Sequence, residues 1–252
     1  MITVTHLWRH PIKSHGREAL AFVDLVAGQS MPWDRRWAVT HVDCKFQTTD
    51  PHWVMCRNFM TGTFAPKLAG IWATFDDKTK TITLRHAELD DLSFAPDDTD
   101  DIARFIAWVS PLCPVDNIRI PNGIITLPDR GLTDTDYPSI SIHNAASHAE
   151  VAERIGRQFE MERWRGNIWL DGLAPWQEWD LIGQDIQIGA ATLRIKEPIK
   201  RCMLTTANPN TGVRDVDTLA VLRDNWDHQN FGIYAEVIRG GKISLGDTAE
   251  VL

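Results

Sequence analysis

Alternation of apolar and polar residues dominates the first 90 positions of the chain. It runs through ITVTHLW at residues 2–8 and returns in segments at residues 18–27 and 35–42. Two further segments, at residues 70–76 and 79–86, adjoin the turn-forming sequence DKTK, as in a hairpin. The first 90 residues are therefore predicted to be mostly β.

The period changes near residue 97. Apolar residues fall at i, i+3, i+4 and i+7, and acidic residues occupy the first turn, which predicts a helix over residues 97–110. Residues 111–139 are rich in Pro, Gly and Asp and predict loops with one short strand. Because the acidic stretch at residues 89–101 separates the two patterns, we divide the chain into domains 1–95 and 96–252.

The second half alternates between short strands and short helices. Ser147 and Glu150 have capping-box spacing and predict a helix over residues 147–159. A second helix is predicted over residues 214–226, and strands are predicted at residues 166–172, 184–189 and 191–198, with two or three more in residues 231–252. Many short strands with few helices predict a mainly β (α+β) fold of barrel-like architecture.

Composition excludes several classes of protein. The chain has 252 residues and a formal net charge of −8, which argues against a nucleic-acid partner but allows a small anionic ligand. No apolar run approaches the roughly 20 residues that span a bilayer, so we expect no membrane association. The first residues lack the pattern of a signal peptide, and none of the four cysteines forms a C-x-x-C pair. Reduced thiols and a cytoplasmic location are therefore expected.

The segment EPIKRCMLTTANPNTG, residues 197–212, is the strongest candidate for chemistry. Its cysteine, Cys202, follows the cations Lys200 and Arg201 and precedes small polar residues. Adjacent cations favour a thiolate, which can act as a nucleophile or as a ligand. A cysteine of this kind can equally be a small buried apolar residue, and the segment alone leaves these alternatives open.

Four sequence blocks together resemble a known family. RCMLTTANPNTGVRD, followed by NFGIYAEVIRGGKISLGDTAEVL, resembles the C-terminal half of MOSC domains, named after the molybdenum cofactor sulfurase C-terminus. HPIKSHGREAL and WDRRWAVTHVDCKFQTTD resemble segments of the β-barrel domain that often precedes MOSC, and WRGNIWLDG is similar to a further MOSC segment. The blocks occur in family order. The resemblance implies an N-terminal β-barrel domain packed on a β-barrel-like MOSC domain, with a ligand in the cleft between them.

The resemblance also implies a cofactor, molybdopterin with molybdenum. In the amidoxime-reducing component subfamily, the cysteine of R-C-x-x-T-T is the protein ligand to molybdenum, which carries over to Cys202 as the catalytic and metal-binding residue. A thiolate is the soft ligand that such a site needs. The residues implied to bind the cofactor are Lys13, Ser14, Arg35, Arg165, Asn167, Arg201, Thr205, Thr206 and Asn208.

The activity implied by the resemblance is that of an oxidoreductase that reduces N-hydroxylated or other N-oxygenated small molecules. The sequence has no cysteine set for an iron–sulfur cluster and no glycine fingerprint for a dinucleotide. Longer relatives continue into a ferredoxin domain, which we do not expect here. An external electron-transfer protein of the ferredoxin or flavin type is therefore expected. The alternative is a carrier of the cofactor, or of sulfur as a persulfide, without reductase turnover.

Some residues depart from the family pattern or suggest other sites. His10 stands where Tyr is common, Gly166 where Pro is common, and Asn208 and Asn210 where acids are frequent. His41, Cys44, His52 and Cys56 have spacings that also suit zinc, although a strand and turn explain them better. His143 and His148 are interpreted as capping or surface histidines. Asp134 and Asp136 are interpreted as residues of a solvated loop.

Overall fold

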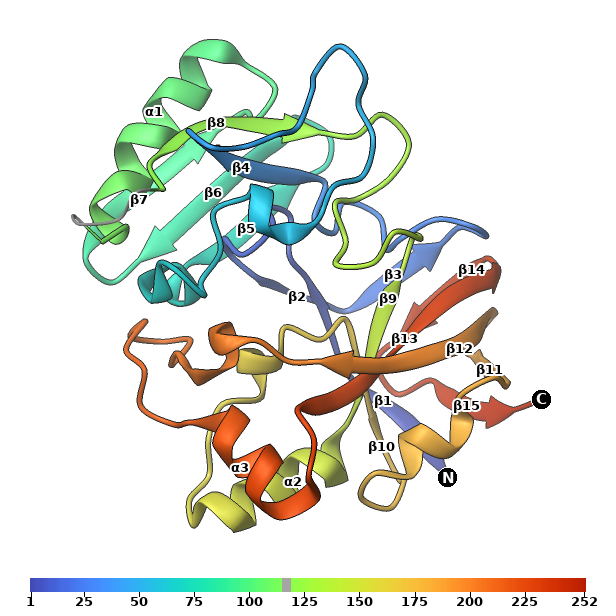
Figure 1. Ribbon diagram of the computed structural model, residues 1–252. Coiled ribbons are helices and arrows are strands. Elements are labelled where there is room, and N and C mark those ends of the chain that lie inside the picture. The colour runs from blue at the N-terminus through green and yellow to red at the C-terminus, as the bar shows by residue number, and fades with distance from the viewer. Residues whose placement is uncertain (115–118) are drawn as a thin grey trace.

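The computed structural model describes residues 1–114 and 119–252. Two lobes share the chain, and in Figure 1 one lies above the other. The upper lobe contains β4 to β8 and α1, and the lower lobe contains β9 to β13, β15, α2 and α3 together with β1. The predicted mainly β fold is confirmed. Residues 115–118 of the predicted loop segment lie outside the described residues.

The lower lobe is a closed seven-stranded barrel. Hydrogen-bonded neighbours follow one another in the order β1, β10, β9, β13, β12, β11 and β15, and β15 pairs again with β1. All these pairings are antiparallel except β9 with β10. The bounds are β1 Ile2–Arg9, β10 Ile168–Asp171, β9 Ile140–Asn144, β13 Asn230–Arg239, β12 Ala191–Lys200, β11 Asp185–Ile188 and β15 Thr248–Val251.

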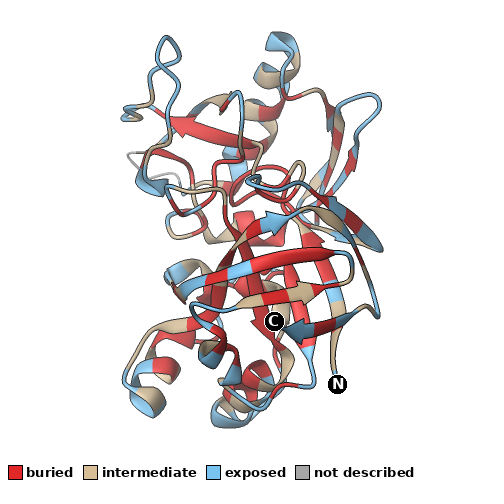
Figure 2. Ribbon diagram, turned by 90° about the vertical axis from the view of Figure 1, so that its right-hand side faces the viewer, coloured by how far each residue is buried: buried red, intermediate tan, exposed pale blue. Residues whose placement is uncertain are grey.

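Alternation along these strands gives the barrel its core. Val4 and Leu7 of β1 pack with Ile142, Ile195 and Ile233 inside the barrel, and all five are buried. Figure 2 shows buried positions concentrated on the barrel strands, with exposed positions in the connecting loops. Burial of such branched apolar side chains is the main stabilising contribution to a fold of this size.

The upper lobe has a second core. The antiparallel sheet of β5 (Trp72–Asp76), β6 (Thr81–His86) and β7 (Leu89–Phe94) packs with the pair β4 (Trp37–His41) and β8 (Pro121–Thr126). Helix α1 (Thr99–Val109) contributes Phe105 and Val109 to this core, and Asp98 caps its N-terminus. The strand at Leu89–Phe94 was not predicted, because its two central aspartates obscured the alternation that buries Leu92 and Phe94.

Strands from the first 25 residues belong to the lower lobe. β1 closes the barrel, β2 (Glu18–Leu20) extends from it, and β3 (Phe22–Leu25) pairs with β14 (Gly241–Ser244). The two lobes are therefore interleaved in sequence. The boundary between residues 95 and 96 stays a prediction.

Helices α2 (Ala145–Ile155) and α3 (Thr218–Trp226) contact each other and share an aromatic-rich cluster with the barrel strands. The capping residue of α2 is Asn144, whose side chain accepts from the backbone N–H of Ala146, so the predicted cap at Ser147 is wrong. Ser147 is buried within the helix and donates to Glu178 instead. The 3₁₀ turns lie at Cys56–Asn58, Pro66–Gly70, Ser110–Leu112, Met161–Trp164, Gln177–Leu181 and Met203–Thr206.

Candidate functional site

A cavity of about 840 Å³ is lined by residues of both lobes. This volume lies within the usual range for a small-molecule site. Seven predicted site residues line it, namely Lys13, Ser14, Arg35, Arg165, Arg201, Cys202 and Thr205. Segments more than a hundred residues apart in sequence therefore meet at one place, although Asn167, Thr206 and Asn208 are absent from the lining.

Lys13 and Ser14 lie in the loop that follows β1. The backbone N–H of Lys13 donates to the backbone oxygen of Trp37 at 2.8 Å. Ser14 has a positive φ of 64°, so the backbone turns tightly at this point of the cavity wall. The Lys13 ammonium is 4% exposed and donates to the backbone oxygen of Leu132 at 2.8 Å and to the carboxylate of Asp134. The loop thus holds a cation inside the cavity.

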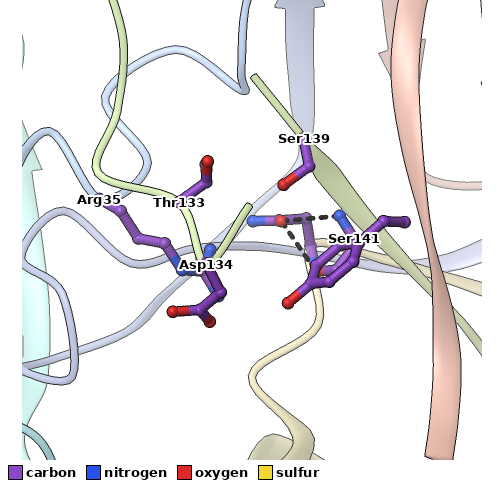
Figure 3. Close-up of a pocket in the computed structure, with 7 residues that line it drawn as sticks. Arg35, Thr133, Asp134, Ser139 and Ser141 are labelled. Carbon is purple, nitrogen blue, oxygen red and sulfur yellow. Dashed lines mark hydrogen bonds between the residues drawn. The ribbon is translucent and has the colours of Figure 1, made fainter. Parts of the chain in front are cut away.

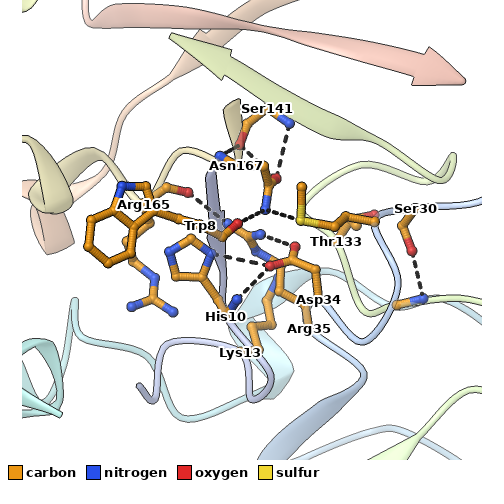
Figure 4. A network of polar contacts seen from close by, with 12 residues as sticks. Trp8, His10, Lys13, Ser30, Asp34, Arg35, Thr133, Ser141, Arg165 and Asn167 are labelled. Atoms are coloured by element: carbon orange, nitrogen blue, oxygen red, sulfur yellow. Dashed lines mark hydrogen bonds and ion pairs between the residues drawn. The ribbon is translucent and has the colours of Figure 1, made fainter. Parts of the chain in front are cut away.

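Asp34 holds the next cation of the cavity, Arg35, in place. Its carboxylate accepts from the backbone N–H of His10 at 2.7 Å and pairs with the guanidinium of its neighbour Arg35 (Figure 4). Although burial by itself would raise it, Arg35 and His10 hold the pKa of Asp34 well below its ordinary value. Burial, Arg165 and Arg35 lower the pKa of His10 to about 3, despite Asp34, so the imidazole is neutral. Arg35 also donates to the backbone oxygen of Arg165 at 3.1 Å.

Arg165 ends the 3₁₀ turn Met161–Trp164 in the left-handed region, with φ +50°. Its side chain is buried and donates to the backbone oxygen of Gly16 at 3.2 Å. Burial, together with the charges of Arg35 and Arg17, lowers its pKa to about 9. A lowered pKa here means that the surroundings disfavour the cation. An anion bound in the cavity would relieve that penalty.

Asn167 lies behind the cavity rather than on its wall. Its amide oxygen accepts from the backbone and the hydroxyl of Ser141 at 3.1 and 2.9 Å, and its amide nitrogen donates to Trp8 at 3.2 Å (Figure 4). Together with Arg35, Thr133, Asp134, Ser139, Ser141 and Tyr234 it lines a small polar cavity of about 10 Å³ (Figure 3). Asn167 therefore supports the strands beside the main cavity.

Cys202 lies just beyond the end of β12, after Arg201, and precedes the 3₁₀ turn Met203–Thr206. Its thiol is exposed and accepts from the Thr63 hydroxyl of the other lobe at 3.5 Å. Thr205 donates to the backbone oxygen of Cys202 at 3.0 Å and is itself buried. The structure thus presents the thiol to the cavity and fixes the turn behind it.

The remaining predicted residues make other contacts. The Arg201 guanidinium donates to the backbone oxygens of Trp164 and Phe231, both at 2.8 Å, and contacts His143. Thr206 donates to the backbone oxygen of Met203 at 2.8 Å. Asn208 donates to Glu160 and Asp215, both at 3.0 Å, and these acids pair with Arg163. Arg201 therefore anchors the residue before Cys202, and Thr206 and Asn208 hold the loop after it.

Sequence reasoning missed several residues of the cavity. Thr63, Cys56 and Tyr234 line it, and none of the three was predicted to bind the cofactor. Asp134 lies exposed in a loop, as interpreted, and its carboxylate also pairs with Lys13. Desolvation would raise the pKa of Asp134, yet Lys13 and Arg35 lower it to about 2. Only the fold brings these residues to the cations.

The two histidines interpreted as capping or surface residues are buried. His143 lies on β9, and a Cβ placed on Gly166 would lie 2.1 Å from its Nδ1 atom. Glycine, in place of the proline common in the family, therefore makes room for His143. His148 contacts the Phe159 backbone oxygen and accepts from the Trp164 indole, both at 3.0 Å.

The alternative zinc site has no support in the structure. Over residues 1–114 and 119–252 there is no group of three or more His, Cys, Asp or Glu side chains that could hold a metal ion. His41 instead contacts the backbone oxygen of Arg57 at 3.0 Å. Within the same ranges, no helix is both long and apolar enough to cross a bilayer.

Two family models match the chain, one in each half. Residues 129–250 match the family model of the MOSC domain, and residues 1–109 match that of the MOSC N-terminal beta barrel domain. The chain is 32% identical over 126 residues to mitochondrial amidoxime reducing component 2 of Homo sapiens and 33% identical over 128 residues to that of Macaca fascicularis. These alignments cover 44% of this chain and only 36% and 37% of the relatives. Among solved structures, the YuaD protein of Bacillus subtilis superposes with a TM-score of 0.49 at 15% identity, covering 100% of this chain and 96% of that one.

Proposed function

We propose that this chain, which belongs to the MOSC domain family and carries that family's N-terminal β-barrel domain, binds a molybdenum cofactor in the cavity between its lobes. The observation that carries the proposal is the meeting of three cations, Lys13, Arg35 and Arg165, with the exposed thiol of Cys202 in one cavity. A molybdopterin offers the complementary groups, an anionic phosphate and a soft metal.

The donor set fits such a group. Arg165 donates to the Gly16 backbone oxygen and carries a charge that its buried surroundings disfavour, so an anion beside it would be stabilising. Lys13 reaches the same cavity from the loop after β1 and can add a compact positive charge. Cys202 supplies a thiol on the same cavity wall. Lys13, Ser14, Arg35 and Arg165 would hold the anionic part, and Cys202 would ligate the metal.

The function that this site supports best is reduction of N-hydroxylated or other N-oxygenated small molecules. When bound, the cofactor would supply two-electron reduction at molybdenum. The chain's own residues would orient the bound groups and offer hydroxyl donors at Tyr234 and Thr63. Burial, followed by the charge of Asp134, raises the pKa of Tyr234, so its hydroxyl stays protonated at neutral pH.

An external electron donor, of the ferredoxin or flavin type, belongs to this proposal. The described cysteines are all free, and of the four only Cys56 and Cys202 line the cavity. Such a pair cannot hold an iron–sulfur cluster of the Cys₄ type. The amidoxime reducing component relatives carry reductase activity in their name, which supports this choice of reaction. The second candidate is a carrier of cofactor or persulfide, which the exposure of the Cys202 thiol also favours.

The deciding experiment uses cofactor-loaded protein with its molybdenum content measured. Reduced viologen as electron donor should support reduction of an amidoxime or an N-hydroxylated purine, whereas NADH alone should not. Bound molybdenum without turnover of any N-oxygenated compound would favour the carrier. Turnover with NADH and no partner would overturn the need for an external donor.

A further inference from the structure

The wall of the cavity beside Cys202 is made by two segments, one from each lobe. Residues 61–64 belong to the upper lobe, and Cys202 with the turn Met203–Thr206 belongs to the lower one. The two segments are in close contact, because a Cβ on Gly62 would lie 2.1 Å from Leu204 Cδ1. The Thr63 hydroxyl meets the Cys202 sulfur at 3.5 Å across the same contact.

Arg214 joins these segments. One terminal nitrogen of its guanidinium donates to the backbone oxygen of Met203 and to the hydroxyl of Thr206. The other donates to the backbone oxygens of Thr63 at 2.8 Å and Gly62 at 3.4 Å. Each nitrogen therefore binds one of the two segments, and the planar guanidinium sets the distance between the segments.

The loop that carries Arg214 is itself fixed against the upper lobe. A Cβ on Gly212, which has a φ of +68°, would lie 2.4 Å from Lys67 Cα. Arg17 donates to the backbone oxygen of Pro209 at 2.7 Å and to that of Ala69 at 2.8 Å. The backbone that carries Arg214 is therefore fixed in position, and the Arg214 guanidinium makes the contact between the two segments beside Cys202.

We propose that Arg214 is a positioning residue for Cys202, which clamps residues 62 and 63 of the upper lobe onto the Cys202 turn and so holds the thiol against the opposite wall. This inference rests on the proposed role of Cys202 in the cavity. Lysine cannot substitute, because a single ammonium lacks the planar fork that reaches both walls together. Loss of the clamp lets the two walls separate and leaves the thiol without a fixed orientation.

The test is an engineered disulfide that reports the separation of the walls. In Thr63→Cys protein, the new thiol and Cys202 are oxidised by oxidised glutathione, which takes up two electrons and two protons as two reduced glutathiones form. At half-oxidation, the square of the reduced glutathione concentration divided by that of oxidised glutathione gives the effective concentration of the thiol pair. The extent of oxidation is read by mass spectrometry of the linked peptides. The measurement needs no molybdenum, so it stands whether or not the proposed function holds.

Arg214→Gln in the Thr63→Cys background should lower this effective concentration about tenfold, since each wall loses its charge-assisted hydrogen bonds. Arg214→Lys keeps the charge and should also fall clearly below the parent. The matched control is Arg223→Gln, an exposed arginine on α3 outside the cavity lining, which should leave the value unchanged.

The unfolding midpoint is measured for each protein in parallel. If Arg214 serves only general stability, Arg214→Gln lowers the midpoint but leaves the effective concentration at the parent value, and the proposal is overturned. Full retention of that value in Arg214→Lys would overturn it equally, and this variant decides the question if Arg214→Gln does not fold.

Discussion

The Asp34 carboxylate accepts the backbone N–H of His10 at 2.7 Å and pairs with the guanidinium of Arg35. One buried anion therefore fixes both the loop after β1 and a cation of the cavity. Because Asp34 is 1% exposed, its charge is stabilised by these partners rather than by water.

Asp34→Asn should destabilise the protein by about 3–5 kcal/mol, because it leaves the Arg35 guanidinium buried without its anion. Urea unfolding monitored by tryptophan fluorescence measures the loss. The control is Asp91→Asn, whose pair with Arg85 is more than half exposed on both sides and should cost about 1 kcal/mol or less. Equal losses in both variants would contradict the role given to Asp34.

Lys13→Ala and Arg165→Ala should each weaken cofactor binding about 10- to 150-fold, the equivalent of a charge-assisted hydrogen bond of about 1.5–3 kcal/mol. Equilibrium dialysis against the cofactor, with molybdenum read by elemental analysis, gives the affinities. Lys78→Ala removes an exposed cation from a turn outside the cavity lining and serves as the control. If both cavity variants bind like the control, the anion site is elsewhere.

Cys202→Ala should abolish stable retention of molybdenum, since no other described cysteine shares its place after β12. Molybdenum content after gel filtration and the metal–thiolate absorption are the two measurements. Cys56→Ala tests the second thiol of the cavity and should keep the metal. Wild-type metal content in Cys202→Ala would remove Cys202 from the coordination sphere.

Gly166→Ala should cost about 1–3 kcal/mol of stability, because its Cβ would overlap the buried His143 ring. His143→Ala removes the obstacle, so the loss from Gly166→Ala should largely vanish in that background. A double-mutant cycle of unfolding free energies measures this coupling. Additive losses in the cycle would show that His143 does not determine the need for glycine.

Stability should fall as the pH drops from about 6.5 towards 4, and His148 contributes to this decline. Burial lowers the pKa of His148 to about 4, despite the hydrogen bond to Phe159. Below the ordinary pKa near 6.5, His148 is protonated in the unfolded chain but stays neutral in the native protein. The contribution of His148 to the free energy of unfolding, about 3 kcal/mol, is therefore lost across this pH window. His148→Gln should flatten the slope of unfolding free energy against pH, whereas His52→Gln, at an exposed histidine, should not.

The cations of the cavity could be predicted because HPIKS, WDRRW and WRGN resemble segments of a known family, and the resemblance implied their role. Taken alone, each of these charged residues would be interpreted as a solvated surface residue. Asp134, Thr63 and Tyr234 could not be found in this way. Each reaches the cavity only through pairing of distant strands or contact between the lobes, and such contacts leave no trace in the local alternation.

The same difference between neighbouring and distant residues explains which helices and strands were predicted. Ser147 has the right spacing for a cap, but α2 begins two residues earlier because Asn144 caps it and Ser147 is drawn to the buried Glu178. The strand Leu89–Phe94 is acidic at its exposed positions, and only its pairing with β6 reveals it. Strand β1 was predicted closely, since the expected segment at residues 2–8 matches Ile2–Arg9.

Closure of the barrel by β1 has a consequence for how the chain is made. β1 is synthesised before the strands that close the barrel on it, since Thr5 bonds to Trp169, 164 residues later, and β15 (Thr248–Val251) follows β13. Until those strands exist, the apolar face of β1 has no permanent cover, and the edges that pair with β10 and β15 have no partner. Contacts so distant in sequence slow folding, and they leave these edges open to pairing with other chains until β10 and β15 have been made.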